Sequence, residues 1–221
     1  MANQTIKLKQ KRSQDRRNRI IVAATRLFGR RGISATSLTD VAKAAKVPLP
    51  SLYDYFADKD DLVAAVPEEN YLALYRQLLA EDDNRDPRRR LRTLYVGNLK
   101  YIDANPDWGR VFFLEIWPSA AIAHGRIRRA VDLYGLRYVE LIRDAVAAGA
   151  YRRDLDPYLA MSALMGGMCQ LAAVWLLYRK PYDLVERGSA LFALLEKSFV
   201  QRSPDDGAAI RYPKLITANR P

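Results

Sequence analysis

The sequence predicts an all-α protein, with a small three-helix unit near the N-terminus and a larger helical domain after it. Apolar residues recur at the spacing of helix faces, and no run alternates like a strand followed by hairpin turn residues. Breaks that contain proline or glycine divide the 221 residues into segments of helical length. The expected segments are a basic flexible arm at 1–14, the three-helix unit at 15–60, the larger domain at 61–202 and an irregular tail at 203–221.

Positive charge is concentrated at the start of the chain. The net charge is +11, and residues 1–31 hold ten lysines and arginines against the single acid Asp15, so nine of these charges lie there. This asymmetry predicts a polyanion as partner, either nucleic acid or an anionic membrane surface. A solvated, partly disordered tail is the alternative that charge alone leaves open.

Several classes of protein are disfavoured by the composition. Because Cys169 is the single cysteine, we expect no disulfide framework and no cysteine-rich zinc site, and a reducing cytoplasm is the simplest location. Charges interrupt every apolar run before it reaches membrane-spanning length, and the N-terminus lacks the apolar core of a secretory signal. His124 is the only histidine, and no catalytic or metal-spaced motif appears, so we predict no enzyme activity, metal or cofactor.

Two helices are predicted at the start of the three-helix unit. The first runs from about Asp15 to Arg30 with one apolar face, and Gly32 marks its end. The second runs from about Leu38 to Ala45. Ser37 can cap the free N–H groups of this second helix, and Asp40 lies three residues later, near the positive end of the helix dipole.

Two prolines define the third helix. Pro48 pushes the residue before it out of helical geometry, whereas Pro50 suits the first position of a new helix, which would end near Phe56. A helix of about two turns must be held by packing, here by Leu52 and Phe56 on one face. The two tyrosines between them then lie near the surface. Two helices, a tight turn and a short third helix behind a basic segment make a helix-turn-helix, whose third helix would enter a DNA major groove.

Six further helices are predicted in the larger domain. The first of these should run from about 58 to 81, with a kink at Pro67. The others are expected at 87–104, 106–117, 119–149, 156–180 and 181–200, separated by proline or glycine breaks.

The segment 19–63 resembles the N-terminal domain of the TetR family of transcriptional regulators. The resemblance rests on "TSLTDVA", on "LYDYFADKDDL", and on the first-helix residues Ala23, Ala24, Leu27, Phe28 and Gly32. The rest of the chain is similar only in its all-helical architecture. The resemblance implies a homodimeric repressor that binds an inverted-repeat operator in double-stranded DNA and is released when a small hydrophobic or amphipathic molecule binds its C-terminal domain.

The resemblance also implies which residues contact DNA. Groove or phosphate contacts are expected from Leu49, Pro50, Ser51, Tyr53, Asp54 and Tyr55, and helix-start phosphate contacts from Thr36, Ser37 and Lys59. Basic residues before the first helix would follow the backbone or enter a minor groove; they are Lys11, Arg12, Arg16 and Arg17. Lys46 replaces the glycine that the family usually has in the turn. It is therefore expected either to take a strained left-handed conformation or to alter the turn, and it could contact a phosphate.

The apolar segment from 157 to 177 has two interpretations. Met161, Met165 and Met168 recur at helical spacing, and Gly166-Gly167 inside a helix usually has a packing reason. Ordinary core is one interpretation. The other, which the resemblance implies, pairs this helix and the last one with their copies in a four-helix dimer interface.

An effector pocket is expected among the helices at 91–149. Its candidate lining residues are Tyr95, Asn98, Leu99, Phe112, Phe113, Glu115, Ile116, Trp117, Tyr134 and Tyr138, with Met165 or Met168 contributing. Ordinary core is again the alternative. A partly buried Glu115 would need a partner, either a ligand group or Arg110 or Arg126. The arginine-rich run at 85–92 could attract an acidic ligand such as an acyl-coenzyme A, or could be a solvated face.

A protein of another class remains as the alternative to a regulator. A small helical lipid-binding or membrane-binding protein, or an enzyme, could carry a non-specific basic arm. The short aromatic third helix favours the regulator, because such a protein has no use for it. The sequence does not distinguish a repressor from an activator.

Overall fold

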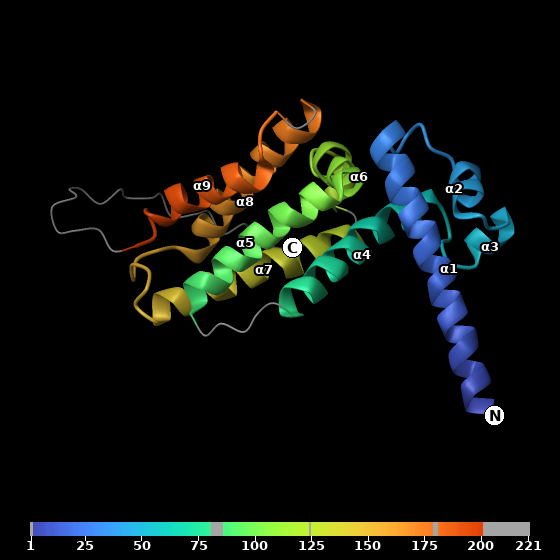
Figure 1. Ribbon diagram of the computed structural model, residues 1–221, viewed down its shortest axis with the longest axis horizontal. Coiled ribbons are helices and arrows are strands. Elements are labelled where there is room, and N and C mark those ends of the chain that lie inside the picture. The colour runs from blue at the N-terminus through green and yellow to red at the C-terminus, as the bar shows by residue number, and fades with distance from the viewer. Residues whose placement is uncertain (1, 81–85, 124, 179–180, 201–221) are drawn as a thin grey trace, which may run out of the picture.

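The computed structural model describes residues 2–80, 86–123, 125–178 and 181–200, with side chains left out at 2–9 and 77–80 (Figure 1). All regular elements in these ranges are helical, which confirms the predicted fold class. Residues 81–85, His124 and the predicted tail at 203–221 lie outside the described residues.

Three helices form an N-terminal unit, called the head below. They are α1 (Ala2–Arg31), α2 (Leu38–Ala45) and α3 (Leu49–Tyr53). The bounds of α2 are those predicted, and α3 starts one residue before Pro50. Residues 2–14, which were expected to form a flexible arm, are helical, because α1 is continuous from Ala2. Lysine, arginine and glutamine in this segment are good helix formers, which favours its helical conformation. The N-terminal part of α1 extends away from the rest of the molecule (Figure 1).

The remaining helices form a larger unit, called the body. They are α4 (Lys59–Ala80), α5 (Pro87–Ala104), α6 (Pro106–Arg110), the π-helical turn η1 (Val111–Ile116), the 3₁₀ turn η2 (Ala120–Ala123), α7 (Gly125–Ala147), α8 (Pro157–Leu177) and α9 (Leu184–Glu196). The predicted helix at 106–117 is therefore an α-helix followed by a π-helical turn, and α4 continues through Pro67. Aspartate side chains cap α5, α8 and α9, and in the first two cases a proline follows directly.

The body is a bundle in which α5 packs between α7 and α9, while α4 covers α7 and α8 pairs with α9 (Figure 1). Its core contains large buried rings, among them Tyr95, Phe112, Tyr138, Trp175 and Phe192. The head contacts the body through α1, which packs on α6 and on α4. The position of the head therefore depends directly on α4 and α6.

One helix in the described ranges, α8, is long and apolar enough to cross a membrane by length and composition. The prediction that no apolar run reaches this length is wrong for α8.

Two glycines in α8 have different surroundings. A Cβ on Gly167 would lie 2.7 Å from Leu191 Cδ2 of α9, whereas a Cβ on Gly166 would meet nothing within 4 Å. Gly167 thus permits close packing within the chain, and Gly166 faces outward.

Candidate nucleic-acid interface and effector cavity

The start of α2 is held by a reciprocal cap. The backbone N–H of Asp40 donates to Ser37 Oγ at 3.1 Å, and the backbone N–H of Ser37 donates to Asp40 Oδ2 at 3.0 Å. The hydrogen bonds from Ser37, its side chain first, lower the pKa of the Asp40 carboxyl. Ser37 is exposed, so this helix end is open at the surface. Its contact with a phosphate stays a prediction.

Thr36 was predicted to contact a phosphate beside Ser37, but its side chain points into the protein. Only 1% of Thr36 is exposed, and its hydroxyl donates to the carbonyl of Gly32 at 2.9 Å. The hydroxyl therefore holds the turn between α1 and α2. The sequence pattern could not reveal this, because the burial of Thr36 depends on how α1 and α2 pack.

The turn between α2 and α3 is built on Lys46 in a left-handed conformation, with φ of 55° and ψ of 48°. Val47 N–H donates to the carbonyl of Ala42 at 3.0 Å, and Lys46 N–H donates to that of Lys43 at 3.2 Å. Lys46 is the one non-glycine residue with positive φ in the described ranges. The turn thus keeps the geometry usual for glycine, and the Lys46 side chain is exposed beside α3.

Helix α3 is anchored from one side and open on the other. Leu52 is fully buried and Phe56 nearly so, as predicted. Pro50, Tyr53 and Asp54 are exposed, with 52% of Tyr53 accessible. Leu49 and Ser51 are half-buried at the edge of this open face, which is the surface that the sequence assigned to the groove.

Tyr55 is less available than its neighbour Tyr53. It is half-buried, and its hydroxyl lies 3.1 Å from Ser13 Oγ of α1. Ser13 was not among the residues predicted to contact DNA, and it joins α1 to the segment that follows α3. Lys59, predicted to meet a phosphate at the start of α4, donates from Nζ to the Ser34 carbonyl at 3.4 Å.

The basic residues of α1 divide into two groups. Lys11, Arg12 and Arg16 are exposed on the extended helix. Arg17 is half-buried, forms an ion pair with Glu69 of α4, and places its guanidinium 5.7 Å from the centre of the Phe56 ring. Arg17 therefore links the head to the body, and its predicted contact with a phosphate stays a prediction.

Glu115 was predicted to be a partly buried carboxylate in the effector pocket, but it is exposed. Its Oε2 accepts a hydrogen bond from the backbone N–H of Ile33 at 3.3 Å, at the turn between α1 and α2. The two arginines proposed as its partners bind other acids. Arg126 of α7 donates to Glu68 at 2.9 Å and also pairs with Asp61, both on α4. Arg110 lies 3.7 Å from Asp107.

A cluster of buried polar side chains lies between α5 and α7. The hydroxyls of Tyr134 and Tyr138 are 3.4 Å apart, and the buried Asn98 side chain lies near both hydroxyls. Burial raises the pKa of both tyrosines. The hydroxyl of Tyr95 is buried without a hydrogen-bond partner among the described residues. Because such groups are rarely left unpaired, this hydroxyl marks a place where a ligand or water could bind.

The other predicted pocket residues do not all join this cluster. Tyr95 itself packs on Phe192 of α9 with ring centres 5.2 Å apart. Leu99 lies against Gly188 of α9, where a Cβ would come within 2.3 Å of its Cδ1. The rest divide by exposure: Phe112, Phe113, Ile116 and Met168 are buried, Met165 is half-buried, and Trp117 is exposed.

A groove of about 610 Å³ runs between α4 and α7 beside this cluster. Tyr134 belongs to the polar cluster and also lines the groove. Tyr71, which was not among the predicted pocket residues, lines the groove as well. The Tyr71 ring lies 4.9 Å from that of Tyr134 and 5.4 Å from that of Phe112. Four other lining residues are exposed and apolar: Leu72, Tyr75, Leu133 and Leu136. Their helical spacing on α4 and α7 could have indicated a shared face.

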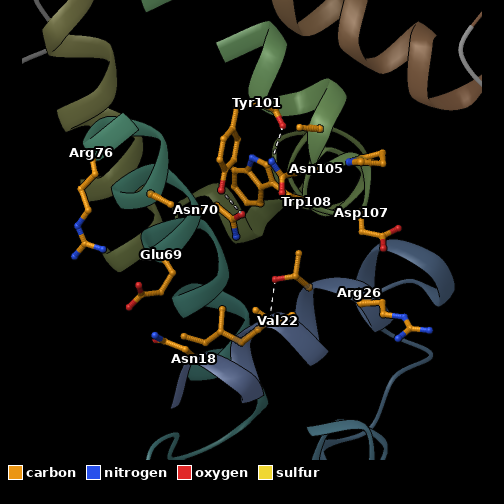
Figure 2. Close-up of a pocket in the computed structure, with 15 residues that line it drawn as sticks. Asn18, Val22, Arg26, Glu69, Asn70, Arg76, Tyr101, Asn105, Asp107 and Trp108 are labelled. Atoms are coloured by element: carbon orange, nitrogen blue, oxygen red, sulfur yellow. Dashed lines mark hydrogen bonds between the residues drawn. The ribbon is translucent and has the colours of Figure 1, made fainter. Parts of the chain in front are cut away.

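A second cleft, of about 540 Å³, lies where α1 of the head meets α4, α5 and α6 of the body (Figure 2). Its walls carry more polar groups than those of the groove, including Asn70, Tyr101 and Asn105. Nothing in the sequence pattern predicted it, because its walls come from segments far apart along the chain.

Comparison with known proteins identifies the family. Residues 20–66 match the family model described as bacterial regulatory proteins, tetR family. The chain is 44% identical over 199 residues to the HTH-type transcriptional regulator AcrR of Shigella flexneri, covering 85% of this chain and 91% of that protein. It is 26% identical over 151 residues to the HTH-type transcriptional repressor DhaR of Mycobacterium sp. strain GP1, covering 67% and 76%. The crystal structure of FadR from Bacillus subtilis in complex with stearoyl-CoA shares the fold, with a TM-score of 0.77 at 19% identity over 82% of this chain and 98% of that chain. The chain belongs to the TetR family of bacterial transcriptional regulators.

Proposed function

We propose that this regulator is a homodimeric repressor. It binds an inverted-repeat operator through the open face of α3, the start of α2 and the exposed basic residues of α1. An apolar or amphipathic small molecule, bound in the body, releases it. The observation that carries the proposal is the exposed surface of α3, which follows the turn at Lys46 and lies beside the basic helix α1.

The chemistry of the head supports DNA binding. Lys11, Arg12, Arg16 and Lys46 are exposed cations that can neutralise phosphates on either side of a groove. Pro50 and Tyr53 project from α3 where an inserted helix meets base edges. Asp54 is the one acid on this face, and it can accept a hydrogen bond only from a base amino group such as that of cytosine.

The surface of α8 supports dimerisation. In its most apolar window the mean hydropathy is 1.6, yet only 33% of the window is buried inside the monomer. A stripe along the helix stays exposed; it consists of Leu159, Ala163, Gly166, Gln170 and Leu177. Leu194 of α9 adds a further exposed apolar side chain. Large exposed apolar surfaces mark association sites, and the small residues of the stripe let a second copy approach closely.

The body supports binding of an apolar or amphipathic effector. The groove between α4 and α7 leads to Tyr134, whose hydroxyl begins the buried polar cluster. An apolar chain could pass along this groove, and a polar group could reach the unpartnered Tyr95 hydroxyl. The relative from Bacillus subtilis was crystallised with stearoyl-CoA, a ligand of this chemical type.

Contacts between body and head provide a route for release. Arg126 of α7 holds the first half of α4 through Asp61 and Glu68, and Glu69 of α4 holds Arg17 of α1. An effector that separates α4 from α7 therefore moves the helix that positions the head. Because operator binding requires both heads of a dimer at a fixed spacing, such a movement weakens it.

Selection of bound fragments from a random duplex library tests operator binding. At moderate salt, where binding driven only by counterion release is weak, we expect an enriched inverted repeat. If no motif is enriched and binding fades uniformly as salt rises, the head binds anions non-specifically and the repressor proposal fails. Stearoyl-CoA, added to the complex with the recovered duplex, then tests release, which we expect to be lost in Leu133→Glu.

Sedimentation of the full chain tests the dimer interface. We expect Leu194→Glu, a charge placed on the exposed surface of α9, to convert the dimer to a monomer. Leu133→Glu on α7 is the matched control, since it introduces the same charge at a similarly exposed leucine away from α8 and α9. Dimers that persist in Leu194→Glu and in a second variant, Ala163→Glu, would rule out this interface.

A further inference from the structure

The cleft between head and body has the form of a ligand site. Its volume of about 540 Å³ falls within the range of small-molecule pockets, roughly 300 to 1,000 Å³. Val22 of α1 lines it and is 68% exposed, although valine is usually buried. The buried indole of Trp108 and the methyl group of Ala73 add apolar surface from the body.

The polar groups of its body wall are already bonded to one another (Figure 2). Tyr101 donates its hydroxyl proton to Asn70 Oδ1 at 3.0 Å, and Asn70 Nδ2 donates to the Val66 carbonyl at 2.8 Å. Asn105 Nδ2 donates to the Tyr101 carbonyl at 2.9 Å. These bonds fix the wall, so the cleft is formed before any ligand arrives, which reduces the ordering that binding requires.

Among the described residues, the charges around the cleft leave two arginines without an acidic partner. Its two acids are neutralised from outside the lining, Glu69 by Arg17 and Asp107 by Arg30. Arg26 of α1 and Arg76 of α4 lie at opposite ends of the cleft and are exposed (Figure 2). Neither forms an ion pair with another residue in the described part of the chain. The cleft therefore complements a negative charge at its rim and an apolar body at its centre.

We propose that this cleft is a second ligand site, separate from the groove between α4 and α7. It binds a small organic anion with a flat apolar body, such as an aromatic carboxylate. The ring lies on Val22, Ala73 and the edge of Trp108. The carboxylate pairs with Arg76, which lies one helical turn after Ala73 on α4, since arginine presents a donor pair that matches both oxygens of a carboxylate.

A ligand in this cleft touches α1 on one side and α4, α5 and α6 on the other. It therefore fixes the position of the head relative to the body. An aromatic contact connects this site with the groove, since the Tyr71 ring lies 5.5 Å from that of Trp108 and 4.9 Å from that of Tyr134.

Calorimetric titration of the full chain with 1-naphthoate, in the absence of DNA, tests the site. The comparison variants are Val22→Glu and Arg76→Gln in the cleft, and Leu133→Glu in the groove between α4 and α7. Val22 and Leu133 are similarly exposed, at 68% and 71%, so both glutamates place one negative charge on a surface without disturbing the core. Circular dichroism melting curves establish that each variant is folded. Naphthamide, which lacks the charge, is the control ligand.

We expect 1-naphthoate to bind the native chain and Leu133→Glu with the same affinity. Binding should weaken about tenfold or more in Val22→Glu and in Arg76→Gln, and naphthamide should bind similarly weakly. Absence of binding to the native chain, unchanged affinity in Val22→Glu, or a loss confined to Leu133→Glu would each overturn the proposal. Because the titration contains no DNA, its failure is distinct from a failure of operator binding.

Discussion

Arg17 of α1 forms an ion pair with Glu69 of α4, so one of the four basic residues of α1 that were predicted to contact the DNA backbone is engaged within the protein. Its guanidinium also lies 5.7 Å from the centre of the Phe56 ring, beside the end of α3. The neighbouring Arg16 is exposed. Two adjacent residues of the same type therefore have different roles.

Arg16→Met and Arg17→Met should separate these roles. Loss of the exposed Arg16 should reduce the slope of operator affinity against salt by about one phosphate contact and leave stability unchanged. Loss of Arg17 should lower the free energy of unfolding by about 1 kcal/mol, because it removes a partly buried ion pair and a cation–π contact. Urea unfolding and operator titrations at several salt concentrations measure both. Identical salt slopes for the two variants would contradict the assignment.

Substitution of Lys46 tests the strain in the turn. Lys46→Gly should raise the free energy of unfolding by about 1 kcal/mol, because glycine adopts the left-handed conformation without steric conflict. Lys46→Ala is the control, since it removes the charge but keeps the Cβ, and it should give no such gain. If Lys46 contacts a phosphate, both variants lose the same operator affinity. Equal stabilities of the two variants would show that the turn is unstrained.

Two serines of the predicted DNA-binding surface should behave differently when changed to alanine. Ser37→Ala removes the cap of α2 and should lower stability by about 1 kcal/mol. Ser51 forms no hydrogen bond through its side chain within the described residues, so Ser51→Ala should leave stability unchanged and alter only operator affinity. Thermal melts followed by circular dichroism decide the point. A stable Ser37→Ala protein would mean that the capping box contributes little.

Cys169 should react slowly with disulfide reagents. Burial raises the pKa of its thiol to about 11, so the reactive thiolate is scarce at pH 8. We expect a rate on the order of a hundredfold below that of a free cysteine, increasing with pH as the thiol ionises. Absorbance after addition of a chromogenic disulfide measures the rate. Fast, stoichiometric reaction in the folded chain at pH 8 would show that Cys169 is accessible and ionised.

Local chemistry accounts for the elements that could be predicted from the sequence. Ser37 and Asp40 define the start of α2 through bonds between residues three apart, and Pro48 keeps Val47 out of helical geometry, so α2 must end before Val47. The start of α5 at Pro87 follows from an aspartate cap and a proline in the first turn. Apolar spacing identified Leu52 and Phe56 as anchors, since residues four apart share a helix face.

The tertiary structure alone decided which of the named side chains face solvent and which partners they meet. Three of these side chains belong to residue types that contact DNA or ligands, yet each binds another group of the protein. Arg17 and Glu115 bind groups that are distant along the chain, and Thr36 binds the carbonyl of Gly32 in the turn before α2. The two cavities likewise arise where helices from separate parts of the chain meet. A sequence pattern reports interactions over a few residues, whereas burial and charge pairing depend on distances in space that only packing of the whole chain sets.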